Sequence, residues 1–157
     1  MNAARRGFSL VELLVVMAVL GVLAAAAYPM AELVRQREQE RELKQALWEI
    51  RAAIDAYKRA RDGNRIEGSG PDSGYPPSLR ALVDGFPSAA ANGPTPVHFL
   101  RRIPRDPFAP PELAAEETWG LRSYESPADR PRAGSDVYDI YSMSTRVGLN
   151  GVPLRQW

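Results

Sequence analysis

An uncharged stretch near the N-terminus constrains the fold of this chain more than any other feature. Residues 13–31 contain no charged side chain and consist mostly of Leu, Val and Ala. A helix needs about 20 such residues to cross the hydrocarbon core of a membrane. Arg5 and Arg6 precede the stretch, and basic residues of this kind stay on the cytoplasmic side of a span. The sequence therefore predicts one N-terminal span, with the rest of the chain on the far side of the membrane.

Glu12 bears on what this stretch is for. The stretch alone fits a secretory signal cleaved near the small residues 24–26, a plain membrane anchor, or a buried core helix. A carboxylate carried deep into lipid costs about 2–3 kcal/mol, and neither a cleaved signal nor a simple anchor needs it. Glu12 either reaches the headgroups without a role, or pairs with a cation. The natural source of that cation is a neighbouring copy, so Glu12 is a functional candidate.

The helix is expected to continue well beyond the uncharged stretch. Of the 14 prolines only Pro29 lies before residue 71, and only two glycines come before Gly63. Such a segment can form one helix, and the run Asp62-Gly63-Asn64 is a typical helix end. Its second half is predicted to be amphipathic, because apolar residues recur at steps of four and three. The predicted apolar stripe consists of Leu43, Ala46, Leu47, Ile50, Ala53, Ile54 and Tyr57.

Charged residues separate the uncharged stretch from this stripe. Residues 35–42 are nearly all charged, and Glu38 and Glu42 alternate with Arg35, Arg37 and Arg41. We interpret them as a solvated helical face that holds ion pairs between neighbouring turns.

Residues 63–157 hold most of the prolines and glycines and are expected to form a small head of short elements. Ser78 is predicted to cap a helix over residues 78–83 that Gly85 ends. Residues 86–96 are expected to be loop. The best strand candidates are residues 119–124 and 137–142, joined by the exposed connection 125–136. Trp157 is expected to fold back onto that sheet. The predicted fold class is α+β, a long helix packed on a small antiparallel sheet.

Composition excludes several kinds of function. The chain has no cysteine and a single histidine, which removes thiolate chemistry, Cys-based zinc sites and multi-histidine metal centres. His98 is interpreted as a surface or packing residue. The formal charge of +1 argues against nucleic acid as a partner, and the arginines within residues 101–108 are a weak basic footprint. That segment is expected to be anchored by Phe99, Ile103 and Phe108. No catalytic constellation is present in the sequence, so we do not expect an enzyme.

Residues 7–12, Gly-Phe-Ser-Leu-Val-Glu, with a basic leader before them and an apolar run after them, resemble the type IV prepilin signal. The resemblance implies cleavage by a prepilin peptidase between Gly7 and Phe8, followed by N-methylation of Phe8. It further implies that Glu12 pairs with the new terminal amine of an adjacent subunit during assembly. Pro29 falls where helices of this family carry a proline that kinks or loosens them. A buried carboxylate is tolerable once it is paired, which agrees with this role.

The head narrows the resemblance to the pseudopilins of type II secretion, above all their major subunit. The features that carry it are Tyr75-Pro76 before a short helix, residues 100–107, Trp119-Gly120, residues 139–142 and the terminal Trp157. The implied organisation is a leader over 1–7, a long helix over 8–62 with its span over 8–29, and a periplasmic head over 63–157. One departure concerns calcium, which related major subunits bind in an acidic C-terminal loop. Residues 142–157 contain no acid, and only Asp136 and Asp139 remain as nearby candidate ligands.

The resemblance implies a structural subunit of a secretion pseudopilus that polymerises from the inner membrane and drives folded proteins across the outer membrane. Its implied partners are further copies, minor pseudopilins, the inner-membrane assembly platform with its ATPase, the prepilin peptidase and membrane lipid. Two alternatives stay open. The first is a type IV pilin for adhesion, motility or DNA uptake, although the lack of cysteine argues against the disulfide-closed loop common in pilins. The second is a signal-cleaved periplasmic binding module.

Overall fold

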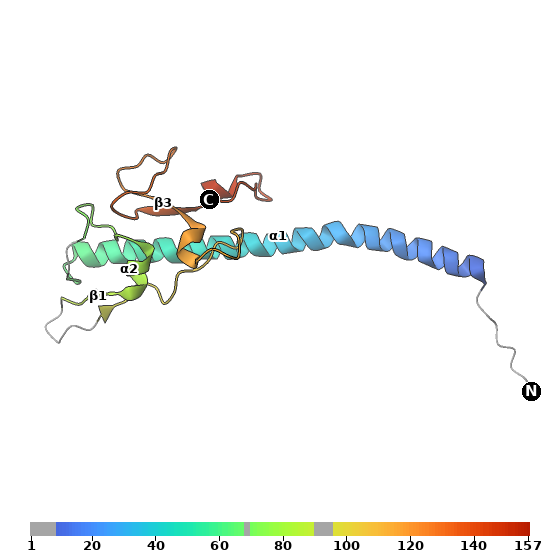
Figure 1. Ribbon diagram of the computed structural model, residues 1–157, viewed down its shortest axis with the longest axis horizontal. Coiled ribbons are helices and arrows are strands. Elements are labelled where there is room, and N and C mark those ends of the chain that lie inside the picture. The colour runs from blue at the N-terminus through green and yellow to red at the C-terminus, as the bar shows by residue number, and fades with distance from the viewer. Residues whose placement is uncertain (1–8, 68–69, 90–95) are drawn as a thin grey trace, which may run out of the picture. The chain divides into compact units, whose positions relative to one another are not determined.

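The computed structural model describes residues 9–67, 70–89 and 96–157 of the chain (Figure 1). It divides into two compact units, Met1–Glu38 and Gln39–Trp157, which meet within the first helix. We call the second unit the head unit. The elements in chain order are α1 (Leu10–Asp62), α2 (Leu79–Asp84), β1 (Phe86–Pro87), β2 (Pro96–Val97), η1 (Ala115–Thr118), β3 (Trp119–Arg122), β4 (Asp139–Ser142) and η2 (Leu154–Gln156).

Helix α1 is continuous from Leu10 to Asp62 and passes through Pro29 without a break. Its end is fixed locally. Asn64 has a φ of 51°, and the Arg65 N–H donates to the Ala60 carbonyl at 2.8 Å. A left-handed residue followed by this long backbone bond is how a Schellman motif closes a helix. The helix therefore ends at the residue where the sequence predicts it. The division into leader, span and head concerns processing and location, and it stays a prediction.

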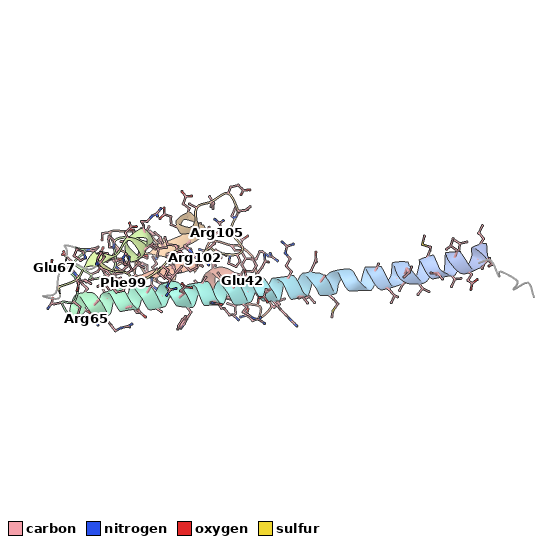
Figure 2. All side chains as sticks on the ribbon, turned by 90° about the horizontal axis from the view of Figure 1, so that it is seen from below. Glu42, Arg65, Glu67, Phe99, Arg102 and Arg105 are labelled. Atoms are coloured by element: carbon pink, nitrogen blue, oxygen red, sulfur yellow. The ribbon has the colours of Figure 1, made fainter. Side chains whose placement is uncertain are left out.

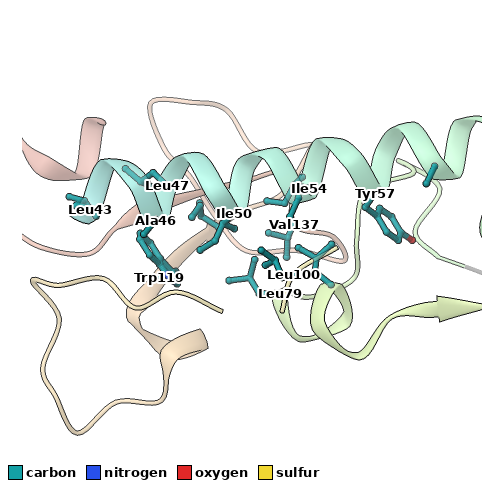
Figure 3. Packing of buried hydrophobic residues seen from close by; sticks show 14 of the residues in the cluster. Leu43, Ala46, Leu47, Ile50, Ile54, Tyr57, Leu79, Leu100, Trp119 and Val137 are labelled. Atoms are coloured by element: carbon teal, nitrogen blue, oxygen red, sulfur yellow. The ribbon is translucent and has the colours of Figure 1, made fainter. Parts of the chain in front are cut away.

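The apolar stripe predicted on the second half of α1 forms the centre of the core in the head unit (Figure 3). Every member of it is buried, with Leu43 and Ile50 fully inaccessible to solvent. The partners come from all over the head unit. The buried residues that pack on the stripe are Ala60, Ile66, Leu79, Leu82, Leu100, Trp119, Val137, Ile140 and Leu154. The long helix packed on small antiparallel sheets confirms the predicted α+β class.

Helix α2 is short and capped at both ends. The Ser78 hydroxyl accepts a hydrogen bond from the Ala81 N–H at 3.2 Å, as expected of an N-cap. Gly85 has a φ of 84°, and its N–H donates to the Ala81 carbonyl. Leu79 and Leu82 are the buried residues of this helix. The predicted helix is thus confirmed, with bounds shifted by one residue.

The described residues form two separate two-stranded antiparallel sheets, where we predicted one. Strands β3 and β4 pair with Trp119 opposite Ser142 and Arg122 opposite Asp139, so both predicted strands form in shortened versions. The prediction of loop over residues 86–96 was wrong at its two ends, because Phe86 pairs with Val97 and Pro87 with Pro96. Strands β1 and β2 each contain a proline, so the sequence did not predict the pairing. It places the Phe86 ring 4.7 Å from that of Tyr57, a tertiary contact that local patterns do not encode.

The C-terminal residues return to α1. The indole of Trp157 lies beneath the ammonium of Lys44, which is 4.5 Å from the ring centroid. The main-chain oxygen of Trp157 accepts a hydrogen bond from the Arg51 guanidinium at 2.9 Å. The C-terminal segment lies beside strand β4, as expected, and the indole ring of Trp157 also reaches α1. A cation on the helix surface offers the indole face an attraction that the strands do not.

Candidate functional site

The first turn of α1 is organised by Ser9 and Glu12. The Glu12 N–H donates to the Ser9 hydroxyl at 3.3 Å, and the Leu13 N–H donates to the Ser9 carbonyl at 3.2 Å. Ser9 thus acts as an N-cap, and Glu12 sits in the first turn, where the helix dipole favours a negative charge. The predicted processing residues Gly7 and Phe8 lie outside the described residues.

The surface of α1 that follows is apolar on all sides. Residues 10–25 are all exposed, including Leu13, Val16 and Leu20. One 18-residue window of this helix is long and apolar enough to cross a membrane, and none of it is buried. Soluble monomers rarely expose apolar patches of this kind, which mark contact with a membrane or another protein. Over the residues that the structure describes, the Glu12 carboxylate has no paired cation.

The profile of the prokaryotic N-terminal methylation motif matches residues 2–28 of the chain. The chain carries a prepilin motif. This motif belongs to the type IV pilin and pseudopilin superfamily, whose members are structural and generally have no enzymatic activity. Together with the exposed apolar helix it indicates anchoring in the inner membrane, processing by a prepilin peptidase and assembly into a filament. No curated protein and no solved structure matches the sequence.

Roles were predicted from the sequence for Gly7, Phe8, Glu12 and Pro29. The first three of these residues lie within the matched segment. Of these, Glu12 lies in the first turn of α1, just before the uncharged stretch. Pro29 lies one residue beyond the matched segment, inside continuous helix. The roles of these residues in processing and assembly stay predictions.

The two acids predicted as calcium candidates are engaged by N–H donors of the chain itself. Asp136 is buried, and its Oδ1 accepts from the Tyr124 N–H at 2.8 Å. Oδ1 of Asp139 accepts from Arg51 Nε and from the Ile140 N–H, each at 2.8 Å. Oδ2 of Asp139 is 4.0 Å from Arg122 Nη1. Positive side chains on both oxygens of Asp139 do not fit a calcium site, which needs oxygen ligands with free lone pairs.

Arg51 is the residue that ties the head unit's C-terminal part to α1. Beyond its ion pair with Asp139, it donates to the Ile140 carbonyl at 3.0 Å and to the main-chain oxygen of Trp157 at 2.9 Å. One guanidinium therefore joins the helix, strand β4 and the C-terminal segment. Its planar fork of donors allows this, whereas an ammonium would offer a single point of charge. A positive side chain thus organises the region around Asp139 in this protein.

Asp106 is the most buried acid of the described head, at 2% exposure. Its carboxylate accepts hydrogen bonds from the Phe108 N–H at 2.8 Å and from the Ser142 hydroxyl. Its own N–H donates to the Thr118 hydroxyl at 3.2 Å. These bonds join the segment after Leu100 to η1 and β4. A buried carboxylate without such donors would destabilise the fold.

The basic segment lies open on the surface. Arg102 and Arg105 face Glu42 of α1 across a groove of about 600 Å³, and Figure 2 shows the three side chains. Arg105 donates to the carbonyls of Leu113 and Pro110, so part of its charge serves to hold the loop. Phe99, Ile103 and Phe108 pack on the core and anchor the segment as predicted. His98 makes a 2.7 Å hydrogen bond with the Val83 carbonyl, which agrees with a packing role.

Two tyrosines of the head unit have perturbed titration. Burial raises the pKa of Tyr57, and the nearby Arg61 offsets part of that rise. Burial likewise raises the pKa of Tyr75, and Tyr138 adds to the effect. The Tyr75 and Tyr138 rings meet edge to face at 4.9 Å, and Lys58 lies over Tyr75. Both groups are neutral packing residues at ordinary pH.

Sequence reasoning missed three polar residues that the head unit depends on. Glu40 was assigned to a solvated face, but it is 7% exposed and its Oε1 accepts from the Leu149 N–H at 2.8 Å. Arg51 and Asp106 received no role. Only Asp106 had a local signal, the Asp-Pro pair in a segment bounded by apolar residues. The partners of Glu40 and Arg51 lie about 90 to 110 positions away along the chain, and no local pattern points to them.

Proposed function

We propose that this chain is a structural subunit of a type II secretion pseudopilus, built by polymerisation of copies from the inner membrane. The growing filament would move folded proteins toward a channel in the outer membrane. The observation that carries the proposal is an apolar helix, exposed on every side, that begins with a capped turn containing Glu12 inside a methylation motif. Such a helix can contact lipid before assembly and the helices of neighbouring copies in the filament afterwards.

In this mechanism prepilin peptidase cleaves between Gly7 and Phe8 and methylates the new amine of Phe8. That amine then pairs with Glu12 of an adjacent copy in the filament core. The charge pair forms where water is scarce, so a copy without it leaves a carboxylate or an amine buried and unpaired. An unpaired buried charge costs several kcal/mol, which favours insertion of each copy in one axial register. Pro29 would loosen the helix where the span ends.

Two observations favour a secretion pseudopilus over a surface pilus. The chain lacks cysteine, and so lacks the disulfide-closed loop common in pilins. The order of Tyr75-Pro76, the short helix α2, the segment around Asp106, and the two paired strands follows the pattern that suggested pseudopilins from the sequence. Arg51 would then hold the C-terminal part where related subunits use calcium.

The first test is the intact mass of the protein extracted from membranes of cells that express a prepilin peptidase. A mass of residues 8–157 plus one methyl group is expected. Gly7→Leu should block processing and leave the full-length mass, while the matched leader change Ala4→Leu should leave processing intact. A mature chain beginning near Ala27 would identify an ordinary secretory signal and overturn the filament proposal.

A second test separates the two kinds of filament. Deletion of the gene should leave exoproteins in the periplasm and leave surface pili and twitching motility unchanged. The opposite pattern, with secretion intact and surface filaments lost, would assign the chain to the type IV pilins instead.

A further inference from the structure

We propose that the C-terminal loop of the head, residues 143–153, contacts the anionic phospholipid headgroups of the membrane in which the chain is anchored. The inference rests on the anchoring of the apolar helix and does not require filament assembly. It assigns a lipid-binding surface to a loop that the mechanism above leaves unused.

The loop exposes several large apolar side chains. Met143 is 51% exposed, Val147 53%, Leu149 43% and Val152 37%. Elsewhere in the described part of the head unit, only Trp48 and Tyr124 are large apolar residues with comparable exposure. The loop is nevertheless held in place. The Gly148 N–H donates to the Val152 carbonyl at 2.9 Å, and the Leu154 N–H donates to the Arg146 carbonyl at 3.0 Å. A fixed turn therefore presents these side chains outward.

The loop itself carries positive charge, and the one acid bonded to it, Glu40, is buried. Residues 142–157 contain two arginines and no acid, although acids make up 19 of the 157 residues of the chain. Arg146 and Arg155 are both exposed. Exposed apolar side chains with basic residues beside them are the pattern by which protein segments bind at the lipid–water interface. A surface that faces only water or an acidic protein groove would not need the apolar part.

The loop lies at the end of the head unit where the chain enters it. The Leu149 N–H is bonded to Glu40, the second residue of this unit, and Figure 1 shows the C-terminal segment running beside this part of α1. Along the chain, this end of the head unit is the one that follows the predicted membrane span.

A second copy of the chain is the competing occupant, and the experiment separates the two. Because the chain has no cysteine, Leu149→Cys carries a single environment-sensitive fluorophore. The full chain is reconstituted into vesicles of phosphatidylethanolamine and phosphatidylglycerol that contain a headgroup spin label. The matched control is Ala128→Cys, an exposed position on the connection at the other end of β4. A third probe at Leu20→Cys reports whether the apolar helix is inserted.

We expect the headgroup spin label to quench the probe at position 149 at least about threefold more strongly than the probe at 128, as for an interfacial segment. The difference should persist when protein is diluted in lipid, and it should shrink with Arg155→Glu or in pure phosphatidylcholine vesicles. Equal quenching at 149 and 128 with position 20 inserted would overturn the proposal. Loss of the difference on dilution would assign the surface to a second copy and also overturn it. A probe at position 20 that stays in water would overturn the anchoring itself, and this proposal with it.

Discussion

The two halves of α1 are equally helical but use their apolar residues in opposite ways. In the first half, leucines and valines such as Leu13, Val16 and Leu20 point to all sides and are all exposed. In the second half, apolar residues occupy one stripe, and Leu43 and Ile50 are fully buried by the rest of the head unit. A stripe of that kind serves the chain's own core. A helix that is apolar on every side is suited to contact with lipid or with another protein.

The acids of the two halves show the same contrast. Glu40 is buried, and the Leu149 N–H of the same chain satisfies it. The side chain of Glu12 has no paired cation among the described residues. Any cation that pairs with Glu12 therefore lies outside the described residues. The comparison teaches that the second half of α1 is packed within the chain, whereas the apolar residues of the first half are left exposed to the surroundings. Changes in each half should therefore affect different measurements.

Glu12→Leu should give the largest effect. Loss of one partner of a buried pair costs about 3 kcal/mol or more, which is more than about a hundredfold in the assembly equilibrium. Chemical cross-linking of intact cells should then give no filament multimers of the chain, while thermal unfolding of the head is unchanged. Glu49→Leu, an exposed acid on the second half of α1, is the matched control and should assemble. Normal filaments from Glu12→Leu would contradict the role of the pair.

Ile50→Ala should lower the free energy of unfolding of the head by about 2–5 kcal/mol, because it leaves a cavity in the core. Leu20→Ala removes a similar volume from an exposed position and should leave head unfolding unchanged. Both are measured by circular dichroism of the full chain in detergent. Equal losses from the two variants would break the comparison between the halves of α1.

Asp106→Ala should destabilise the head by about 2–3 kcal/mol, because it leaves the Ser142 hydroxyl and the Phe108 N–H without their acceptor. Chemical denaturation gives the value. Asp129→Ala changes an exposed acid on the connection between β3 and β4 and serves as the control. A loss below that of the control would show that the buried carboxylate is not structural.

Alkaline pH should weaken the head through Tyr57. Its raised pKa means that the folded state holds the proton more tightly than the unfolded state does. The stability it contributes is complete below pH about 10, the unfolded value, and falls above it by at most about 1.4 kcal/mol per pH unit. Tyr57→Phe should flatten this decline in unfolding experiments at pH 9 to 11, measured against wild type.

Trp157→Phe should have the smallest effect. Nε1 of Trp157 is buried, and within the described parts of the chain it has no hydrogen-bond acceptor. Phenylalanine removes that unsatisfied donor but also some ring contact with Lys44, so the two changes offset each other to within about 1 kcal/mol. Trp157→Ala loses the ring altogether and should lower the melting temperature clearly. A large loss from the phenylalanine variant would mean that Nε1 has a partner in solution.

Features set by neighbouring residues could be predicted from the sequence, whereas contacts between distant residues could not. The stripe from Leu43 to Tyr57, the Ser78 cap and the end of α1 at Asp62 follow from spacing and residue type over a few turns, and the structure confirms them. The pairing of Phe86 with Val97 was missed because each of these short strands contains a proline, a residue that is unfavourable in strands. In the sequence, Arg51 and Glu40 look like ordinary charged residues on the surface of a helix. Their hydrogen-bond partners are distant along the chain and come close only in the folded head.

By itself, the sequence determined that the chain has a long helix with an apolar first half, an acid at its head and a prepilin motif around that acid. These features depend on composition and spacing within about 50 residues, where helix geometry fixes which side chains share a face. Only the tertiary structure decided that a guanidinium on α1 holds Asp139 and Trp157, and that Glu40 holds the turn at Leu149. Hydrogen bonds between groups so far apart along the chain form only after packing has brought them together, and packing depends on the whole head at once.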